Sequence, residues 1–252
     1  MLAKRASLFF LCLLVILLAW TLSVRFDSTA TVHYRFETDS HSEHNLTLAI
    51  PLAEYREYKE RPRPVYEDGL NKNELAKKVL MKYRSMALDP GDDYLIDVIV
   101  SDLNEVAIAG ELDSRGRAEV VLRFVQSLTY TRDFDMSPYG EYPRYPVETL
   151  FDQGGDCEDT SILLAAILIE MDYDVALLFF EEFDHMGLSV YFPEEAGIKM
   201  YGNSWIHDDN DDGYGEEDER RYWYLDTSGG HSIGWCPDEY AQTPSYVFPM
   251  GG

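Results

Sequence analysis

The chain has few cysteines, and their number excludes a scaffold held together by disulfides. Only three of the 252 residues are cysteine, and Cys12 lies in an apolar N-terminal stretch. Cys157 and Cys236 remain for the globular part, too few for a disulfide framework. One bridge between these two residues stays possible. The hydrophobic content of 46% predicts a chain that can bury a core.

Basic residues are also scarce. The sequence contains 46 acidic and 21 basic residues, which gives a formal net charge of −25. Such a surface repels nucleic acid and anionic lipid headgroups, so we expect no nucleic-acid partner. We interpret the excess of acid as a solvating surface that tolerates salt, and a halophilic host is the corresponding hypothesis.

One long hydrophobic run lies near the N-terminus. Residues 6–24 ("ASLFFLCLLVILLAWTLSV") carry no charge, and their length is close to the roughly 20 residues of a membrane-spanning helix. Lys4 and Arg5 precede the run and predict that the domain lies outside the cytoplasmic membrane. A cleaved signal peptide is the main alternative, although its apolar part is usually shorter. We expect a single-pass anchor over residues 1–25, and the Asn45 glycosylation sequon agrees with an extracytoplasmic domain.

The rest of the chain shows helical and strand patterns, which together predict an α+β fold. Alternating or buried apolar runs predict strands at 31–36, 46–50, 175–180, 185–192 and 222–226. Apolar residues at helical spacing predict helices over 71–86, 94–108 and 117–128. The charged, proline-containing segment 55–64 is expected to cross the surface without regular structure.

A long loop leads into Cys157 and a fully apolar helix. The loop, residues 136–156 ("MSPYGEYPRYPVETLFDQGGD"), is rich in proline and glycine, and loops of this length are usually functional. Its part Tyr139–Tyr145 is predicted to form one wall of a cleft. Residues 161–171 have almost no polar face, so this helix should be buried on all sides. Cys157 would then be the first residue of a central buried helix.

The start of that helix cannot activate Cys157 alone. Unpaired backbone N–H groups there favour an anion by about 0.3–1 kcal/mol. This is less than one pKa unit, which corresponds to about 1.4 kcal/mol, and the neighbouring acids raise the thiol pKa. A histidine is therefore needed. His185 begins a strand and shares one face of it with small residues, and Asp226 ends another strand. Cys157, His185 and Asp226 therefore offer a nucleophile, a base and an orienting carboxylate.

Four stretches of the sequence resemble the transglutaminase-like superfamily of papain-type cysteine enzymes. They are "YPVETL", "GGDCED", "HMGLSV" and "YWYLDTSG", within residues 124–233, and they are most similar to archaeal and bacterial membrane-associated transglutaminase-like domains and to bacterial transglutaminase-like cysteine proteinases. The resemblance implies a papain-type core in which a central buried helix packs on an antiparallel sheet. It also implies a triad of Cys157, His185 and Asp226, and an acyl-enzyme at the cysteine. Gln126 lies where a papain-type enzyme often has a polar oxyanion donor.

Each candidate also has a purely structural interpretation. Cys157 could be an inert buried thiol, His185 a strand residue with satisfied hydrogen bonds, Asp226 a turn cap and Gln126 an exposed helix residue. The regions that we predict are an anchor at 1–25, an accessory region of strands and helices at 26–115, and a transglutaminase-like core at 116–252.

Two acidic clusters are candidates for calcium, although the predicted chemistry requires no cofactor. Residues 208–219 ("DDNDDGYGEEDE") match the EF-hand loop pattern, and the oxygen ligands would be Asp208, Asn210, Asp212 and Glu219. A plain acidic insertion is the simpler interpretation, because strand and loop patterns flank this segment. The acids around the cysteine are most simply a helix cap. The resemblance to calcium-dependent relatives implies a cation site there as the alternative, with the ligands Asp156, Glu158 and Asp159.

The sequence thus predicts a membrane-anchored, extracytoplasmic thiol enzyme. It would hydrolyse or transfer an amide or peptide acyl group of a protein or peptide substrate through an acyl-enzyme at Cys157. The alternative is a non-catalytic surface interaction module of the same fold, stabilised by calcium.

Overall fold

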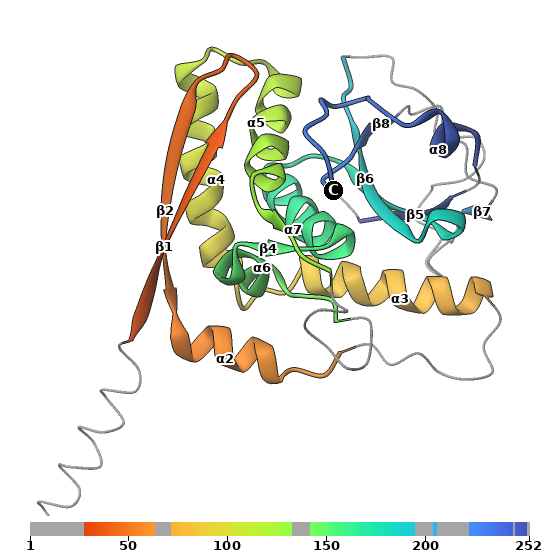
Figure 1. Cartoon of the computed structure of the whole chain (residues 1–252), viewed down its shortest axis with the longest axis horizontal. Helices are drawn as coiled ribbons and strands as arrows, with labels where there is room; N and C mark the ends of the chain where they lie inside the picture. The colour runs from red at the N-terminus through yellow and green to blue at the C-terminus, as the bar shows by residue number, and fades with distance from the viewer. Residues whose placement is uncertain are drawn as a thin grey trace, which may run out of the picture.

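The computed structural model describes residues 28–63, 72–132, 142–194, 204–205, 222–243 and 245–250. One central helix lies between a β-hairpin with its neighbouring helices and a five-stranded sheet (Figure 1). This mixture of helix and sheet confirms the predicted α+β class. The N-terminal apolar run lies outside the described residues, and no helix within them is long and apolar enough to cross a membrane.

The described chain begins with an antiparallel hairpin of β1 (Thr29–Glu37) and β2 (Glu43–Pro51). Along both strands apolar residues alternate with polar ones, so one face of the hairpin is apolar. The buried residues of that face are Val32, Tyr34, Phe36, Leu46, Leu48 and Ile50. This face packs on the helices α4 and α5 that follow, which confirms both predicted strands.

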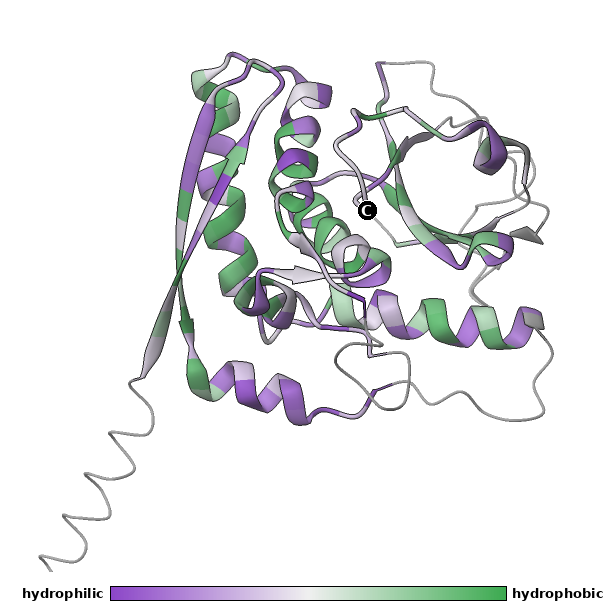
Figure 2. Ribbon diagram, in the orientation of Figure 1, coloured by the Kyte–Doolittle hydropathy of each residue, from purple (hydrophilic) through white to green (hydrophobic). Residues whose placement is uncertain are grey.

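Four helices follow the hairpin: α2 (Leu52–Glu60), α3 (Lys72–Ala87), α4 (Asp93–Ala109) and α5 (Ser114–Gln126). The last three confirm the predicted helices. The surface crossing expected at 55–64 is wrong for residues 55–60, which belong to α2. Only Tyr58 of this helix is buried, so its sequence has too few apolar positions to show helical spacing. In Figure 2, which colours the ribbon by hydropathy, most residues of this helix are hydrophilic.

The long loop before the cysteine contains regular structure that the sequence analysis did not predict. Helix α6 (Pro146–Asp152) begins with proline at its first position, and the Glu148 carboxylate accepts from the backbone N–H of Tyr145 at 3.0 Å. After it, β4 (Gly154–Gly155) pairs in parallel with β3 (Thr129–Tyr130). These elements hold the segment that leads into the cysteine close to the end of α5.

Helix α7 (Cys157–Glu170) is the centre of the fold, and it begins at Cys157 as predicted. It is buried continuously from Cys157 to Leu168. Four helices (α3, α4, α5 and α6) and two strands of the sheet, β5 and β6, pack around it. The main hydrophobic core contains residues from the hairpin, from α3–α5 and from α7, and therefore from both 26–115 and 116–252.

The sheet lies on the other side of α7. Its strand order is β7 (Ser204–Trp205), β9 (Tyr246–Pro249), β5 (Val175–Phe180), β6 (His185–Tyr191) and β8 (Tyr222–Leu225). All neighbouring pairs are antiparallel except β7 and β9, which are parallel. A short 3-10 helix, η2 (Glu181–Phe183), connects β5 to β6, and α8 (Asp238–Gln242) follows β8. The three predicted later strands are confirmed.

The open face expected beside His185 on β6 is not present. Residues 185–190 are all buried, and the ring of Tyr224 fills the space over Gly187. A Cβ atom at Gly187 would lie 2.7 Å from that ring. The small residue therefore allows Tyr224 to approach β6, which is a packing role.

Candidate active site

The start of α7 is held by close packing of the chain around Asp159. The backbone N–H of Asp156 donates to the Asp159 carboxylate at 3.3 Å, which is one half of a capping box. A Cβ at Gly155 would lie 2.5 Å from the Cβ of Asp159. The glycine before the "DCED" motif is therefore required for the chain to pass so close to the helix start.

Arg144 compensates the charge of Asp159. Its backbone N–H donates to one oxygen of the Asp159 carboxylate at 2.6 Å, and its guanidinium forms an ion pair with the other. The Arg144 and Asp159 side chains are only 1% and 0% exposed. Asp159 is thus committed to the helix start and to this pair, whereas Asp156, the N-cap residue for which a capping role was predicted, makes no capping hydrogen bond with its side chain.

The thiol of Cys157 lies in a dry environment at this helix start. It is 8% exposed, and its Sγ lies 3.4 Å from Oε2 of Glu158. Burial raises the pKa of Cys157 to about 11, and Asp156 adds to the shift, although the backbone N–H of Met186 acts in the opposite direction. Burial also raises the pKa of Glu158 well above its ordinary value, with Asp156 and the thiol contributing. The resting site therefore contains a neutral thiol.

His185 lies at the start of β6 and is also buried. Its Nε2 is hydrogen-bonded with the Tyr224 hydroxyl at 3.1 Å and lies 3.9 Å from Oδ1 of Asp226. The rings of Phe180 and Tyr240 lie parallel or tilted beside the imidazole. Burial lowers the pKa of His185, and Asp226 opposes this shift. The imidazole is therefore a neutral base at pH 7, and its Nδ1 makes no hydrogen bond within the described part of the chain.

Asp226 has the predicted position next to His185 and also caps a turn. Its Oδ1 accepts hydrogen bonds from the backbone N–H of Ser228 at 2.8 Å and from the Ser228 hydroxyl at 2.6 Å. Both interpretations of this residue therefore describe real contacts. The turn fixes the carboxylate, which a residue that orients an imidazole requires.

Gln126 does not fit the oxyanion role predicted for it. Its amide group donates to the backbone carbonyls of Asp226 and His231, both at 2.8 Å. Its Oε1 accepts from Arg123 at 2.9 Å. Because an amide has two N–H donors, both are in use here. Gln126 instead ties α5 to the turn that carries Asp226.

The structure brings the sequence-predicted residues into one region but does not join all of them. Cys157 and Met186, the residue after His185, line the same cavity, and His185 lies next to Asp226. Among the described residues, no hydrogen bond connects the Cys157 thiol to the His185 imidazole. Both Cys157 and Cys236 are free thiols, so the disulfide between them is excluded.

Neither predicted calcium site is seen. Asp208, Asn210, Asp212 and Glu219 lie outside the described residues. Around the cysteine, Asp156, Glu158 and Asp159 do not form a ligand set, because Asp159 is paired with Arg144. Within the residues that the structure describes, no group of three or more acidic, histidine or cysteine side chains could hold a metal ion.

The sequence analysis missed two residues of this region, Arg144 and Tyr224. Arg144 lies in the loop that we expected to form a cleft wall, but the described residues 142–145 are largely buried and do not line the cavity beside Cys157. Tyr224 could have been found from strand alternation, since it shares a face of "YWYLD" with Asp226. No sequence signal identified Arg144 as the partner of Asp159.

Comparisons with known proteins give only distant structural similarity. No protein-family model and no curated protein matches the chain. The chain is similar to solved structures of Legionella pneumophila LapG in an EGTA-treated and a calcium-bound form, each at 20% identity and a TM-score of 0.35. The match covers 68% of this chain and 78% and 81% of those chains. A third LapG structure matches at 19% identity and a TM-score of 0.32. Similarity at this level does not identify the functional residues of this chain.

Proposed function

We propose that the chain is a transglutaminase-like thiol enzyme in which Cys157 forms an acyl-enzyme with an amide or peptide carbonyl. The observation that carries the proposal is the setting of His185. One ring nitrogen faces Asp226 and Tyr224, and Met186, the next residue along β6, lines the same cavity as Cys157. A nucleophile, a base and a carboxylate from distant parts of the sequence therefore meet in one buried region.

The pKa shifts favour a reaction that begins from a neutral pair. Nε2 faces Asp226, so the imidazole proton stays on that nitrogen and Nδ1 can accept another. In the proposed first step Nδ1 takes the thiol proton while Sγ attacks the carbonyl carbon. The C–N bond then breaks, and the imidazolium returns the proton to the leaving amine. Water or an amine attacks the resulting thioester, and the same imidazole carries its proton as the thiol is restored.

A peptidyl vinyl sulfone tests this proposal. In this reaction the sulfur of Cys157 attacks the vinyl group of the probe, and the adjacent carbon of the probe takes up a proton. Mass spectrometry detects the product. We expect labelling of Cys157 in the full chain, slowed about 10²–10⁴-fold by His185→Ala. Asp226→Asn should slow it as well, since the amide cannot stabilise the imidazolium by charge. Cys236→Ser is the matched control, because Cys236 is also a free thiol with a pKa raised to about 11, and it should leave labelling at Cys157 unchanged.

A non-catalytic interaction module remains the second candidate. It is favoured by the absence, among the described residues, of a hydrogen bond between Cys157 and His185. For such a module the vinyl sulfone would label Cys157 only after denaturation, and His185→Ala would have no effect. That result would end the enzyme proposal.

Membrane anchoring and an extracytoplasmic domain belong to the proposal on sequence grounds. The uncharged run 6–24 behind Lys4 and Arg5 supports them. A calcium requirement at Asp208–Glu219 stays a prediction, as does the choice between hydrolysis and transamidation.

A further inference from the structure

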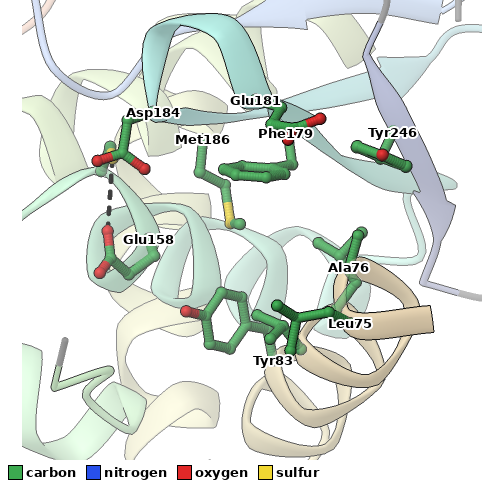
Figure 3. A pocket seen from close by; sticks show the side chains of 12 residues that line it. Leu75, Ala76, Tyr83, Glu158, Phe179, Glu181, Asp184, Met186 and Tyr246 are labelled. Carbon is green, nitrogen blue, oxygen red and sulfur yellow. Dashed lines mark hydrogen bonds between the residues drawn. The ribbon is translucent and has the colours of Figure 1, made fainter. Parts of the chain in front are cut away.

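A cavity of about 440 Å³ opens beside Cys157 (Figure 3). Its size is typical of sites that hold a small ligand or one side chain of a larger one. Cys157 and Glu158 are among the residues that line it, and most of the other lining residues are apolar, including Val79, Phe179, Met186 and Tyr246. The candidate nucleophile therefore faces an apolar space of defined shape.

The walls of this cavity come from two parts of the chain. In Figure 3, Leu75, Ala76 and Tyr83 of α3 lie opposite Phe179 and Met186 of the sheet. Helix α3 belongs to the first third of the chain, which the family resemblance does not cover. One wall of the cavity thus comes from outside the stretches that carry the resemblance, and its residues help to determine which side chains fit.

The charged residues that line the cavity are all acidic. Glu181 and Asp184 lie on the turn between β5 and β6, just before His185, and both are exposed. No lysine or arginine is among the residues that line the cavity in the described part of the chain. The chain as a whole carries a net charge of −25, so the field at the cavity favours a cation.

We propose that this cavity binds a large apolar side chain of a peptide substrate close to the carbonyl that Cys157 attacks, and that the acids at its mouth favour a lysine or arginine beside it. The inference rests on the proposed function and adds the substrate class. Each methylene group that enters an apolar pocket favours binding, which gives discrimination against alanine. The acids act from an exposed position, so their contribution is smaller.

The first experiment compares peptidyl vinyl sulfones on the full chain. Each probe has two variable positions, the two nearest the electrophile. One of them carries Phe, Leu, Ala or Asp and the other carries Lys or Glu, and each combination is made in both orders. We expect Phe or Leu to react with Cys157 at least about tenfold faster than Ala at one of these positions. Lys should exceed Glu by about threefold, the effect of an exposed ion pair.

Two variants connect this preference to the cavity. Ala76→Phe fills the α3 side and should reduce the rate with Phe and Leu probes by about tenfold, while the Ala probe changes by less than about threefold. Ala76→Leu is the milder replacement if the phenylalanine does not fold. Glu181→Gln should reduce the preference for Lys, because Asp184 remains. Glu182→Gln is its control, because Glu182 is exposed on the same turn but does not line the cavity.

A binding measurement separates this inference from the proposed function. Fluorescently labelled peptide amides with Phe-Lys or Ala-Glu are titrated into Cys157→Ala, which cannot react. Selective binding of the Phe-Lys peptide supports the cavity even if no probe labels Cys157. Labelling without selectivity, or selectivity that Ala76→Phe and Ala76→Leu leave unchanged, overturns the cavity while the enzyme proposal stands. Absence of both labelling and selective binding overturns both.

Discussion

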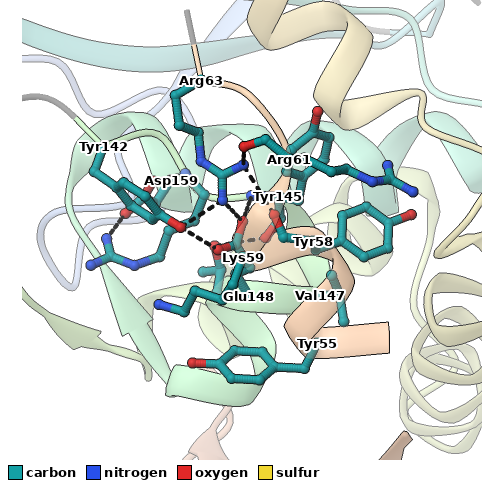
Figure 4. Close-up of polar contacts among 12 residues, drawn as sticks. Tyr55, Tyr58, Lys59, Arg61, Arg63, Tyr142, Tyr145, Val147, Glu148 and Asp159 are labelled. Carbon is teal, nitrogen blue, oxygen red and sulfur yellow. Dashed lines mark hydrogen bonds and ion pairs between the residues drawn. The ribbon is translucent and has the colours of Figure 1, made fainter. Parts of the chain in front are cut away.

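Two buried polar clusters lie on either side of the start of α7, and their charges are compensated differently. In the first, which we call the ion-pair cluster, Arg63 and Glu148 form one buried pair and Arg144 and Asp159 another (Figure 4). Tyr142 and the backbone of Tyr145 donate further hydrogen bonds to Glu148. In the second, which we call the thiol site, Cys157, Glu158, His185, Tyr224 and Asp226 lie close together without lysine or arginine as an ion-pair partner in the described residues.

The difference separates a structural cluster from a functional candidate. Opposite charges compensate one another in the ion-pair cluster. In the thiol site, burial without a cation raises the pKa of Cys157 and of Glu158, and it lowers the pKa of His185. Buried titratable groups with shifted pKa values gather at sites of chemistry. Substitutions in the two clusters should therefore have different consequences.

Arg144→Met should produce the largest loss of stability. It leaves the Asp159 carboxylate charged, buried and without its cation. Breaking a buried pair in this way typically reduces the free energy of unfolding by about 3–5 kcal/mol. Urea denaturation of the full chain, followed by circular dichroism, measures the change.

The double variant Arg144→Met with Asp159→Asn is the control for this prediction. An asparagine carries no charge and keeps one oxygen for the backbone N–H of Arg144, although its amide nitrogen then replaces the oxygen that accepts from the backbone N–H of Asp156. We expect it to recover a large part of the lost stability. If Arg144→Met alone stays within about 1 kcal/mol of the unchanged protein, the pair does not stabilise the start of α7.

Glu158→Gln should instead raise the free energy of unfolding at neutral pH. The pKa of Glu158 is raised in the folded state, so the folded chain holds a proton that the unfolded chain releases above its ordinary pKa. The unchanged protein therefore loses stability relative to Glu158→Gln as the pH rises above that value. Thermal unfolding at pH 4 and pH 8 should show the variant gaining relative stability at the higher pH.

Exposed Glu182 provides the matched control, and Glu182→Gln should show no such pH-dependent difference. A Glu158→Gln variant that loses relative stability with rising pH would mean that Glu158 is charged and compensated. The contrast between the two clusters would then disappear.

The fold could be predicted where the sequence has strong periodicity. The alternation in the hairpin, the apolar spacing in α3–α5 and the continuous apolar run of α7 each predicted an element that the structure contains. Helix α2 was missed because it buries a single residue. Helix α6 was missed because the prolines and glycines of the surrounding segment 136–156 are typical of a loop, although Pro146 in fact begins the helix.

The site was predictable in its residue types but not in its contacts. The motif around Cys157 and the strand alternation predicted that His185 and Asp226 lie close together, and the structure places them next to each other. The partners of Gln126 and Asp159 depend on tertiary packing across about 100 and 15 residues of sequence, respectively, and no local pattern records such pairs. The same is true of the cavity, whose α3 wall is distant in sequence from the cysteine.

Tyr224→Phe should have the smallest effect of these substitutions, and it tests how the thiol site holds its imidazole. The change removes the hydroxyl that lies 3.1 Å from Nε2 of His185 but keeps the ring that packs over Gly187. One hydrogen bond is worth about 1 kcal/mol, so labelling of Cys157 should slow by roughly fivefold. Gly187→Ala is the stronger comparison, because its Cβ would displace the whole ring. Should Tyr224→Phe slow labelling as much as His185→Ala, the hydroxyl would have to take part in proton transfer, and Asp226 alone would not be the group that orients His185.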